Sequence, residues 1–282
     1  MIFLILSVLS STAIFVLFKL FNKYNINTLQ AIVFNYITAF TCGILLYDKP
    51  INVDSFISEP WFFAALGLGF LFISIFNVMA LTAQKNGLSV ASVASKMSVI
   101  IPIVFGIIVY NESIGFQKVI GIILALLAVY LTSIKPKSNV VLTKAIYLPI
   151  ILFLGSGVID TSVNHFAPDG NMPLFLAIIF GSAFLIGLVL ITLKTKQTKQ
   201  KFNPKSIPFG IALGLVNYSS MYFLLKALRV DGFESSTIFT INNVAIVAVS
   251  CLTGLLLFKE VISSKNWIGV GLALISIILV TL

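Results

Sequence analysis

Lys96 lies inside a long apolar run, within residues 92–98, whose sequence is SVASKMS. An ammonium group at membrane depth costs several kcal/mol unless it is paired or hydrated, and it is by default a candidate functional group. We predict that Lys96 is a cationic anchor for an anionic or zwitterionic substrate. The structural alternative is that Lys96 reaches the nearer membrane interface or pairs with a structural carboxylate.

Small polar residues accompany Lys96 at a spacing of three, namely Ser89, Ser92, Ser95 and Ser98. Residues at this spacing share one drifting helix face, which either lines a wet cavity or lets two helices pack closely. We predict Ser92 as a substrate contact on this face.

A second polar stretch, residues 235–243, corresponds to this one, and an offset of 147 residues places Lys96 on Asn243. We predict that Asn242 and Asn243 meet Lys96 at the membrane midplane. A plain polar contact between helices is the alternative for both asparagines.

Further polar residues interrupt other apolar runs. They are Asn35, Asn77, Asn217, Tyr218 and Tyr222. We predict that Asn77 and Tyr222 donate hydrogen bonds at the cavity. The alternative for each of the five is a contact between two helices. Pro102 removes one backbone hydrogen bond from its helix and is a candidate hinge.

Asp160, His165 and Asp169 gather at the end of one apolar run. A carboxylate and an imidazole can exchange a proton near neutral pH, but loop positions are usually solvated. We therefore favour a solvated helix end for His165 and Asp169. Asp160 lies deeper and is the candidate counter-ion or proton-coupling residue.

The elements that position these residues follow from composition. The 282 residues are 59% hydrophobic and 10% charged, which is more apolar surface than a soluble domain can hide. Membrane-spanning helices need about 20 apolar residues, and continuous apolar runs favour helices over barrel strands. The sequence predicts an all-α integral membrane protein with ten transmembrane helices, at 2–21, 28–47, 61–83, 88–110, 116–134, 146–164, 173–193, 207–227, 233–257 and 266–282.

The two halves of the chain resemble each other. A Glu-x-Ile-x6-Gly-x2-Leu-Ala pattern begins at Glu112 and again at Glu260. Because each unit has five helices, consecutive copies enter the membrane in opposite senses, an arrangement from which many secondary transporters are built. We predict two inverted five-helix repeats, residues 1–137 and 138–282.

These features resemble the drug/metabolite transporter (DMT) superfamily in its EamA-type branch: ten helices in two halves, a Ser-rich helix start, the Glu after the fourth helix and the Gly-x2-Leu-Ala fifth helix. The resemblance covers essentially the whole chain. It implies a carrier with a central cavity lined by the third, fourth, eighth and ninth helices, working as an exporter or proton-linked exchanger.

The predicted function is secondary transport of a small anionic or zwitterionic metabolite, such as an amino acid, by alternating access across the cell (inner) membrane. The expected partners are that substrate, the lipid bilayer and protons. No cofactor, metal or nucleic-acid partner is expected, and motifs of hydrolytic enzymes are absent from the sequence. A multidrug or lipid-linked-substrate exporter is the alternative, as is a structural or receptor protein that transports nothing.

Orientation follows from the distribution of Lys and Arg. Connections after odd-numbered predicted helices hold 13 of the 18 basic residues, and those after even-numbered helices hold 4. Because the more basic loops stay in the cytoplasm, the count predicts that both termini face outward. Members of the superfamily commonly keep both termini inside, so the charge count and the resemblance disagree.

Overall fold

A computed structural model describes residues 1–50, 57–85, 91, 94–96, 98–111, 115–133, 147–198, 202–258 and 264–281. Some positions used in the sequence predictions lie outside these residues: the predicted substrate contact Ser92, the repeat boundary at 137/138, and the motif glutamates Glu112 and Glu260. The described part is helical, without a strand. It contains seven helices that are long and apolar enough to cross a membrane, together with three shorter apolar helices. The all-helical membrane class predicted from the sequence is confirmed.

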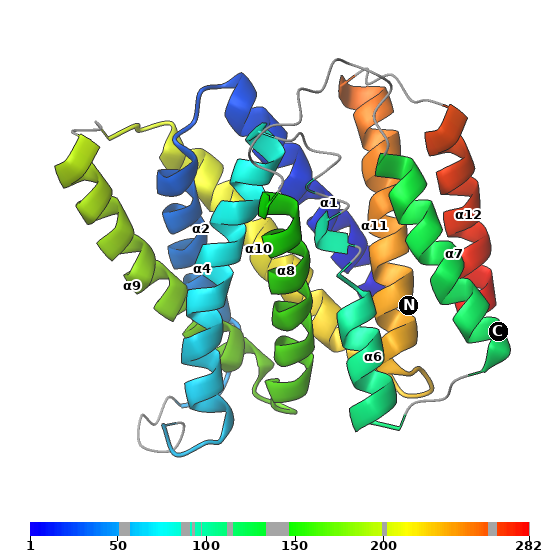
Figure 1. The fold of residues 1–282 in the computed structure, drawn as a ribbon. Helices are drawn as coiled ribbons and strands as arrows, with labels where there is room; N and C mark the ends of the chain where they lie inside the picture. Colours follow the sequence, from blue (N-terminus) through cyan, green and yellow to red (C-terminus); the bar gives the residue numbers. More distant parts are fainter. Residues whose placement is uncertain are drawn as a thin grey trace.

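The helices follow the apolar runs, most of them within a few residues (Figure 1). They are α1 (Ile2–Lys23), α2 (Thr28–Leu45), α4 (Trp61–Lys85), α6 (Ile100–Val109), α7 (Phe116–Ser133), α8 (Tyr147–Phe166), α9 (Met172–Thr198), α10 (Ser206–Leu228), α11 (Ser235–Phe258) and α12 (Ser264–Thr281). The largest differences are at α9, which extends past the predicted end of its run, and at α6, which begins well inside its run.

Short turns between the helices explain where the runs end. Asn25 and Asn111 both have a φ of 52°, in the left-handed region that asparagine tolerates better than most residues. Gly170 and Gly232 have φ values of 82° and 89°, which glycine adopts without strain. Asn27 then starts α2 by accepting a hydrogen bond from the Gln30 N–H, as an N-cap residue does.

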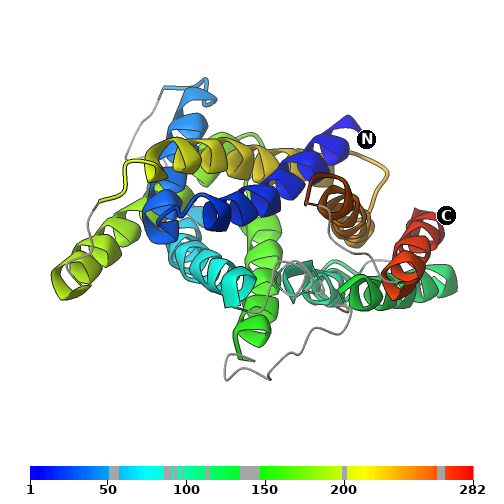
Figure 2. The same cartoon turned by 90° about the horizontal axis from the view of Figure 1, so that it is seen from above.

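Helices that are far apart in the sequence pack side by side. α2 lies against α9 and α10, α4 against α8 and α9, and α1 against α10 and α11; α7 pairs with α12 at one end of the molecule (Figures 1 and 2). The largest buried cluster joins α1, α2, α4, α8, α9 and α10 through aromatic and aliphatic side chains such as Tyr36, Phe76, Phe175 and Phe180. In a bilayer, such close side-chain packing replaces the hydrophobic effect as the main attraction between helices.

Glycine permits the closest crossings. A Cβ atom on Gly69 of α4 would lie 2.7 Å from the Ile179 carbonyl oxygen of α9, and a Cβ atom on Gly214 of α10 would lie 2.5 Å from the Asn35 carbonyl oxygen of α2. No side chain fits at these distances, so the two backbones can approach only because these residues are glycine.

The helices run in alternating directions through the bundle (Figure 1). Helix ends at the face that holds the chain termini carry two ion pairs, Arg229 with Asp169 and Lys118 with Glu234. Helix ends at the opposite face carry lysines, among them Lys19, Lys23, Lys194, Lys196 and Lys205. The charge asymmetry counted in the sequence therefore separates the two faces of the bundle.

Candidate functional site

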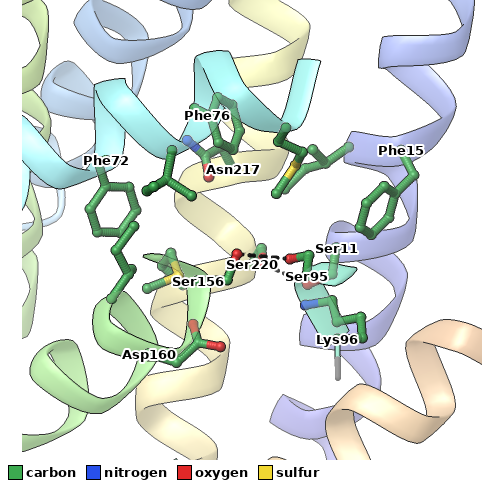
Figure 3. Close-up of a pocket in the computed structure, with 15 residues that line it drawn as sticks. Ser11, Phe15, Phe72, Phe76, Ser95, Lys96, Ser156, Asp160, Asn217 and Ser220 are labelled. Carbon is green, nitrogen blue, oxygen red and sulfur yellow. Dashed lines mark hydrogen bonds between the residues drawn. The ribbon is translucent and has the colours of Figure 1, made fainter. Parts of the chain in front are cut away.

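A cavity in the middle of the bundle brings five segments together (Figure 3). It encloses about 90 Å³ of water-accessible space, enough for several water molecules or a small polar group. Its walls come from four helices, α1, α4, α8 and α10, and from the helical residues 94–96, which precede α6. The lining residues are Ser11, Ile14, Phe15, Phe72, Ile75, Phe76, Met79, Ser95, Lys96, Ser156, Ile159, Asp160, Asn217, Ser220 and Met221.

Two ionisable side chains of opposite charge type line the cavity, Lys96 and Asp160, and they lie on opposite walls (Figure 3). Among the described residues, neither group belongs to a direct ion pair. An ionisable group inside a membrane costs less when it borders a polar cavity or an oppositely charged group, and both side chains are accessible to a ligand in this cavity.

Hydroxyl groups connect the walls. The Oγ atoms of Ser11 on α1 and Ser220 on α10 are 2.6 Å apart, and those of Ser95 and Ser156 are 3.2 Å apart (Figure 3). Ser95 precedes Lys96, and Ser156 lies one helical turn before Asp160. Because a hydroxyl can both donate and accept, these serines can rearrange around a polar ligand.

The remaining wall is apolar. Phe15, Phe72, Phe76 and Met79 come from α1 and α4, and Met221 comes from α10. The site can therefore hold a molecule that has charged groups at one part and an apolar body at another.

The structure brings two of the sequence-predicted residues together in this cavity, Lys96 and Asp160. Their roles in binding and coupling stay predictions. Asn242 and Asn243 are each 2% exposed on α11 and do not line the cavity, and the Asn242 Oδ1 has no hydrogen-bond partner in the described structure.

The two other predicted donors, Asn77 and Tyr222, contact residues of their own helices. Asn77 donates to the Ile73 carbonyl one turn earlier, at 2.7 Å. Tyr222 stacks on Tyr218, and the Lys226 ammonium lies 4.9 Å from the Tyr222 ring centroid. Neither lines the cavity. Their roles as ligands remain untested predictions.

Pro102 is buried near the start of α6. The proline ring leaves the Ser98 carbonyl without its usual partner four residues later, and the Ile101 N–H bonds to this carbonyl instead, at 2.9 Å. The chain makes a turn at residues 98–99, which begins two positions after Lys96. This local break is where a hinge would act, and the hinge itself stays a prediction.

The solvated helix end favoured for His165 and Asp169 agrees with their exposure. His165 Nδ1 lies 3.1 Å from the Tyr110 hydroxyl, and Asp169 pairs with Arg229. Asp160 is set apart from both because it faces the cavity.

Sequence reasoning missed the polar cavity residues Ser11, Ser156, Asn217 and Ser220 as members of one site. Two signals were present in the sequence. Asn217 and Ser220 are three residues apart, and Ser156 and Asp160 are four apart, so each pair shares a helix face. The lining also differs from that implied by the resemblance, because α1 and α8 contribute and α11 does not.

Residues 1–134 match the EamA-like transporter family. The chain belongs to this family, which is part of the DMT superfamily. It is therefore a multi-pass membrane protein and a transporter of the DMT type. The recognition made from the Glu-x-Ile-x6-Gly-x2-Leu-Ala repeats is confirmed.

Similarity to individual proteins extends over the whole length. An uncharacterised protein of Haemophilus influenzae is 31% identical over 284 residues, which cover 97% of this chain and 95% of that protein. A crystal structure of another protein superposes with a TM-score of 0.67 at 14% identity and covers 98% of both chains. At this identity the superposition shows a shared fold alone.

Proposed function

We propose that this transporter carries a small zwitterionic or anionic metabolite, such as an amino acid, by alternating access. The observation that carries the proposal is the placement of Lys96 and Asp160 on one cavity in the middle of the bundle. Charged groups inside a membrane protein typically mark the path of a substrate or an ion. Lys96 binds the anionic group of the substrate.

The charge of the lining favours a zwitterion over a plain anion. Lys96 and Asp160 are the charged residues of this lining, and together they are formally neutral. A carboxylate bound at Lys96 would leave Asp160 without a countercharge, whereas a zwitterion supplies a charge for each group. Matching both charges gives specificity, because unpaired charges in a low dielectric are costly.

The packing of the helices supports two inverted five-helix repeats, here taken as residues 1–137 and 138–282. Gly69 and Gly214 are 145 positions apart, and each makes an equivalent close crossing, one with α9 and the other with α2. The helix pairs α1–α10 and α4–α8 are likewise exchanged by this relation, as are α2–α10 and α4–α9. Rocking of two such repeats about the central cavity gives alternating access.

An apolar drug or a lipid-linked substrate is the second candidate, favoured by the phenylalanines and methionines of the other wall. A substrate of this kind would not require both charges. The two candidates therefore differ in their dependence on Lys96.

Substrate flux into proteoliposomes tests the proposal. Purified protein is first screened against amino acids, organic acids and phosphates by thermal shift, because a ligand that binds only the folded state raises its stability. Uptake of the best ligand should fall at least about tenfold in Lys96→Gln, as expected when a charge-assisted hydrogen bond is lost. Lys96→Arg should restore only part of it, because a guanidinium is a planar fork and an ammonium is a point charge.

Lys196→Gln is the matched control, since Lys196 is exposed near the end of α9. It should transport as wild type does. Unchanged flux in Lys96→Gln would remove the charged site from the mechanism and favour the apolar substrate.

The cell membrane is the proposed location, with export or proton-linked exchange as the mode. From the Lys and Arg count we also propose that both termini face outward. A single cysteine placed within residues 195–198, on a background without Cys42 and Cys251, is treated in intact cells with an impermeant thiol reagent. Protection that is lost on permeabilisation supports this orientation, whereas prompt labelling in intact cells shows that the termini are cytoplasmic.

A further inference from the structure

A chain of three groups leads from the core of α2 to the cavity. The Asn35 Nδ2 donates to the Ile32 carbonyl oxygen at 3.3 Å, and the Asn217 Nδ2 donates to the Asn35 Oδ1 at 3.0 Å. Asn35 is 0% exposed and Asn217 is 3% exposed. Asn217 lines the cavity, whereas Asn35 lies behind it.

The direction of these bonds follows from the chemistry of the groups. A backbone carbonyl can only accept, so the Asn35 amide must turn its NH₂ toward Ile32 and its oxygen toward Asn217. The Asn217 amide must then turn its NH₂ toward Asn35. Its own Oδ1 is left for the cavity, and Figure 3 shows the Asn217 amide there with its oxygen turned inward.

The packing of α2 against α10 holds this arrangement. Gly214, one turn before Asn217, lies so near α2 that a Cβ atom would be 2.6 Å from the Thr38 Cβ. Rotating the Asn217 amide by half a turn would place its oxygen against the Asn35 oxygen, and two acceptors cannot bond to each other. The interhelical contact thus determines which atom a ligand meets.

We propose that Asn35 is a positioning residue which presents the Asn217 Oδ1 to the substrate as a fixed acceptor for an N–H group. This inference rests on the proposed function and deepens it. A cavity that has an acceptor-only atom here, together with the Asp160 carboxylate, selects a molecule with N–H donors over the same molecule without them. A primary ammonium is such a group.

The test compares two ligands in detergent-purified protein. One is the proteinogenic L-amino acid that wild type binds most tightly, and the other is its des-amino acid, which has a hydrogen in place of the ammonium. The measured quantity is the ratio of their dissociation constants. Asn217→Ala should reduce the preference for the amino acid about tenfold, because hydrogen bonds to charged groups are the stronger class.

Asn35→Ala should reduce the same preference although it removes no atom from the cavity lining. The double variant should be no worse than Asn217→Ala alone, because a residue that acts through Asn217 has no effect once Asn217 is gone. Asn35→Leu, of similar volume and without an acceptor, should behave as Asn35→Ala does and serves if the alanine variant fails to fold. Ser219→Ala is the control, since its hydroxyl bonds to the Leu215 carbonyl of its own helix and does not line the cavity.

An unchanged ratio in Asn217→Ala would overturn the acceptor role. Additive losses in the double variant would overturn the positioning role of Asn35, leaving it a separate structural residue. If wild type binds no amino acid at all, the proposed function fails for this substrate class, and the inference fails with it. The outcomes are distinguishable because the first two require a wild-type protein that binds.

Discussion

Lys96 and Asn243 stand 147 positions apart, at corresponding places in the two halves, yet their surroundings differ. Lys96 is half-buried on the cavity wall and faces Asp160 across it. Asn243 is 2% exposed on α11, and no residue of α11 lines the cavity. Gly69 and Gly214 each lie in close contact with a neighbouring helix, α9 and α2 respectively. In the repeat that we propose, the two halves would share these helix crossings while only one half supplies this part of the site.

The largest effect on stability is expected when a lysine replaces Asn243, the residue of the second half that corresponds to Lys96 in the predicted repeat. Asn243→Lys puts an ammonium at a buried position, and we expect it to lower the free energy of unfolding by about 3 kcal/mol or more. The yield of monodisperse protein in detergent measures this. Lys96→Asn, which makes the first half resemble the second, should fold normally. A stable Asn243→Lys protein would contradict the difference and show that α11 borders water.

Asp160 lines the same cavity as Lys96, and replacing it tests the predicted proton coupling. Asp160→Asn carries no titratable proton, so flux should lose its response to a pH gradient. Counterflow exchange should persist only at a raised substrate concentration, because the variant keeps Lys96 but lacks the charge that we propose pairs with the substrate's ammonium. Both are measured in proteoliposomes. Asp169→Asn is the control, because Asp169 is exposed and pairs with Arg229 at a helix end. Accumulation driven by the gradient in Asp160→Asn would exclude Asp160 from coupling.

The proposed repeat predicts equal sensitivity at two glycines. Gly69→Ala and Gly214→Ala should each cost about 1–3 kcal/mol, because the added methyl overlaps the neighbouring helix. Gly67→Ala is the matched control on the same helix, since a Cβ atom there meets nothing within 4 Å. Thermal unfolding of purified protein measures all three. Tolerance of alanine at one of the pair alone would show that the two crossings are not equivalent.

The smallest effect is expected at Asn242, whose buried Oδ1 lacks a partner in the described structure. Replacing an unpaired polar group by an apolar one of similar size is neutral or stabilising. Asn242→Leu should therefore leave stability unchanged or raise it by about 1 kcal/mol, as measured by thermal unfolding. A loss of substrate affinity would instead place Asn242 in the site, as the sequence predicts for both Asn242 and Asn243.

Much of the fold could be predicted from local features. The apolar runs gave the helices because their length matches the bilayer, and turns occur at Asn25, Asn111, Gly170 and Gly232 where the runs are interrupted. Lys96 and Asp160 could be singled out because ionisable residues in apolar helices are costly. The lining around them could not be predicted, since facing helices are chosen by packing between segments far apart in the sequence, such as those of Ser95 and Ser156.

The sequence by itself determined that this chain is a helical membrane protein of the EamA-like family, and it identified the two charges inside the membrane. Only the tertiary structure decided that Lys96 and Asp160 share one cavity, that α11 does not line it, and that the Asn217 amide donates to Asn35. A helical period shows which residues share a face, but not which neighbour that face meets. The neighbour depends on interhelical distance and rotation, which here follow from close contacts such as those at Gly69 and Gly214.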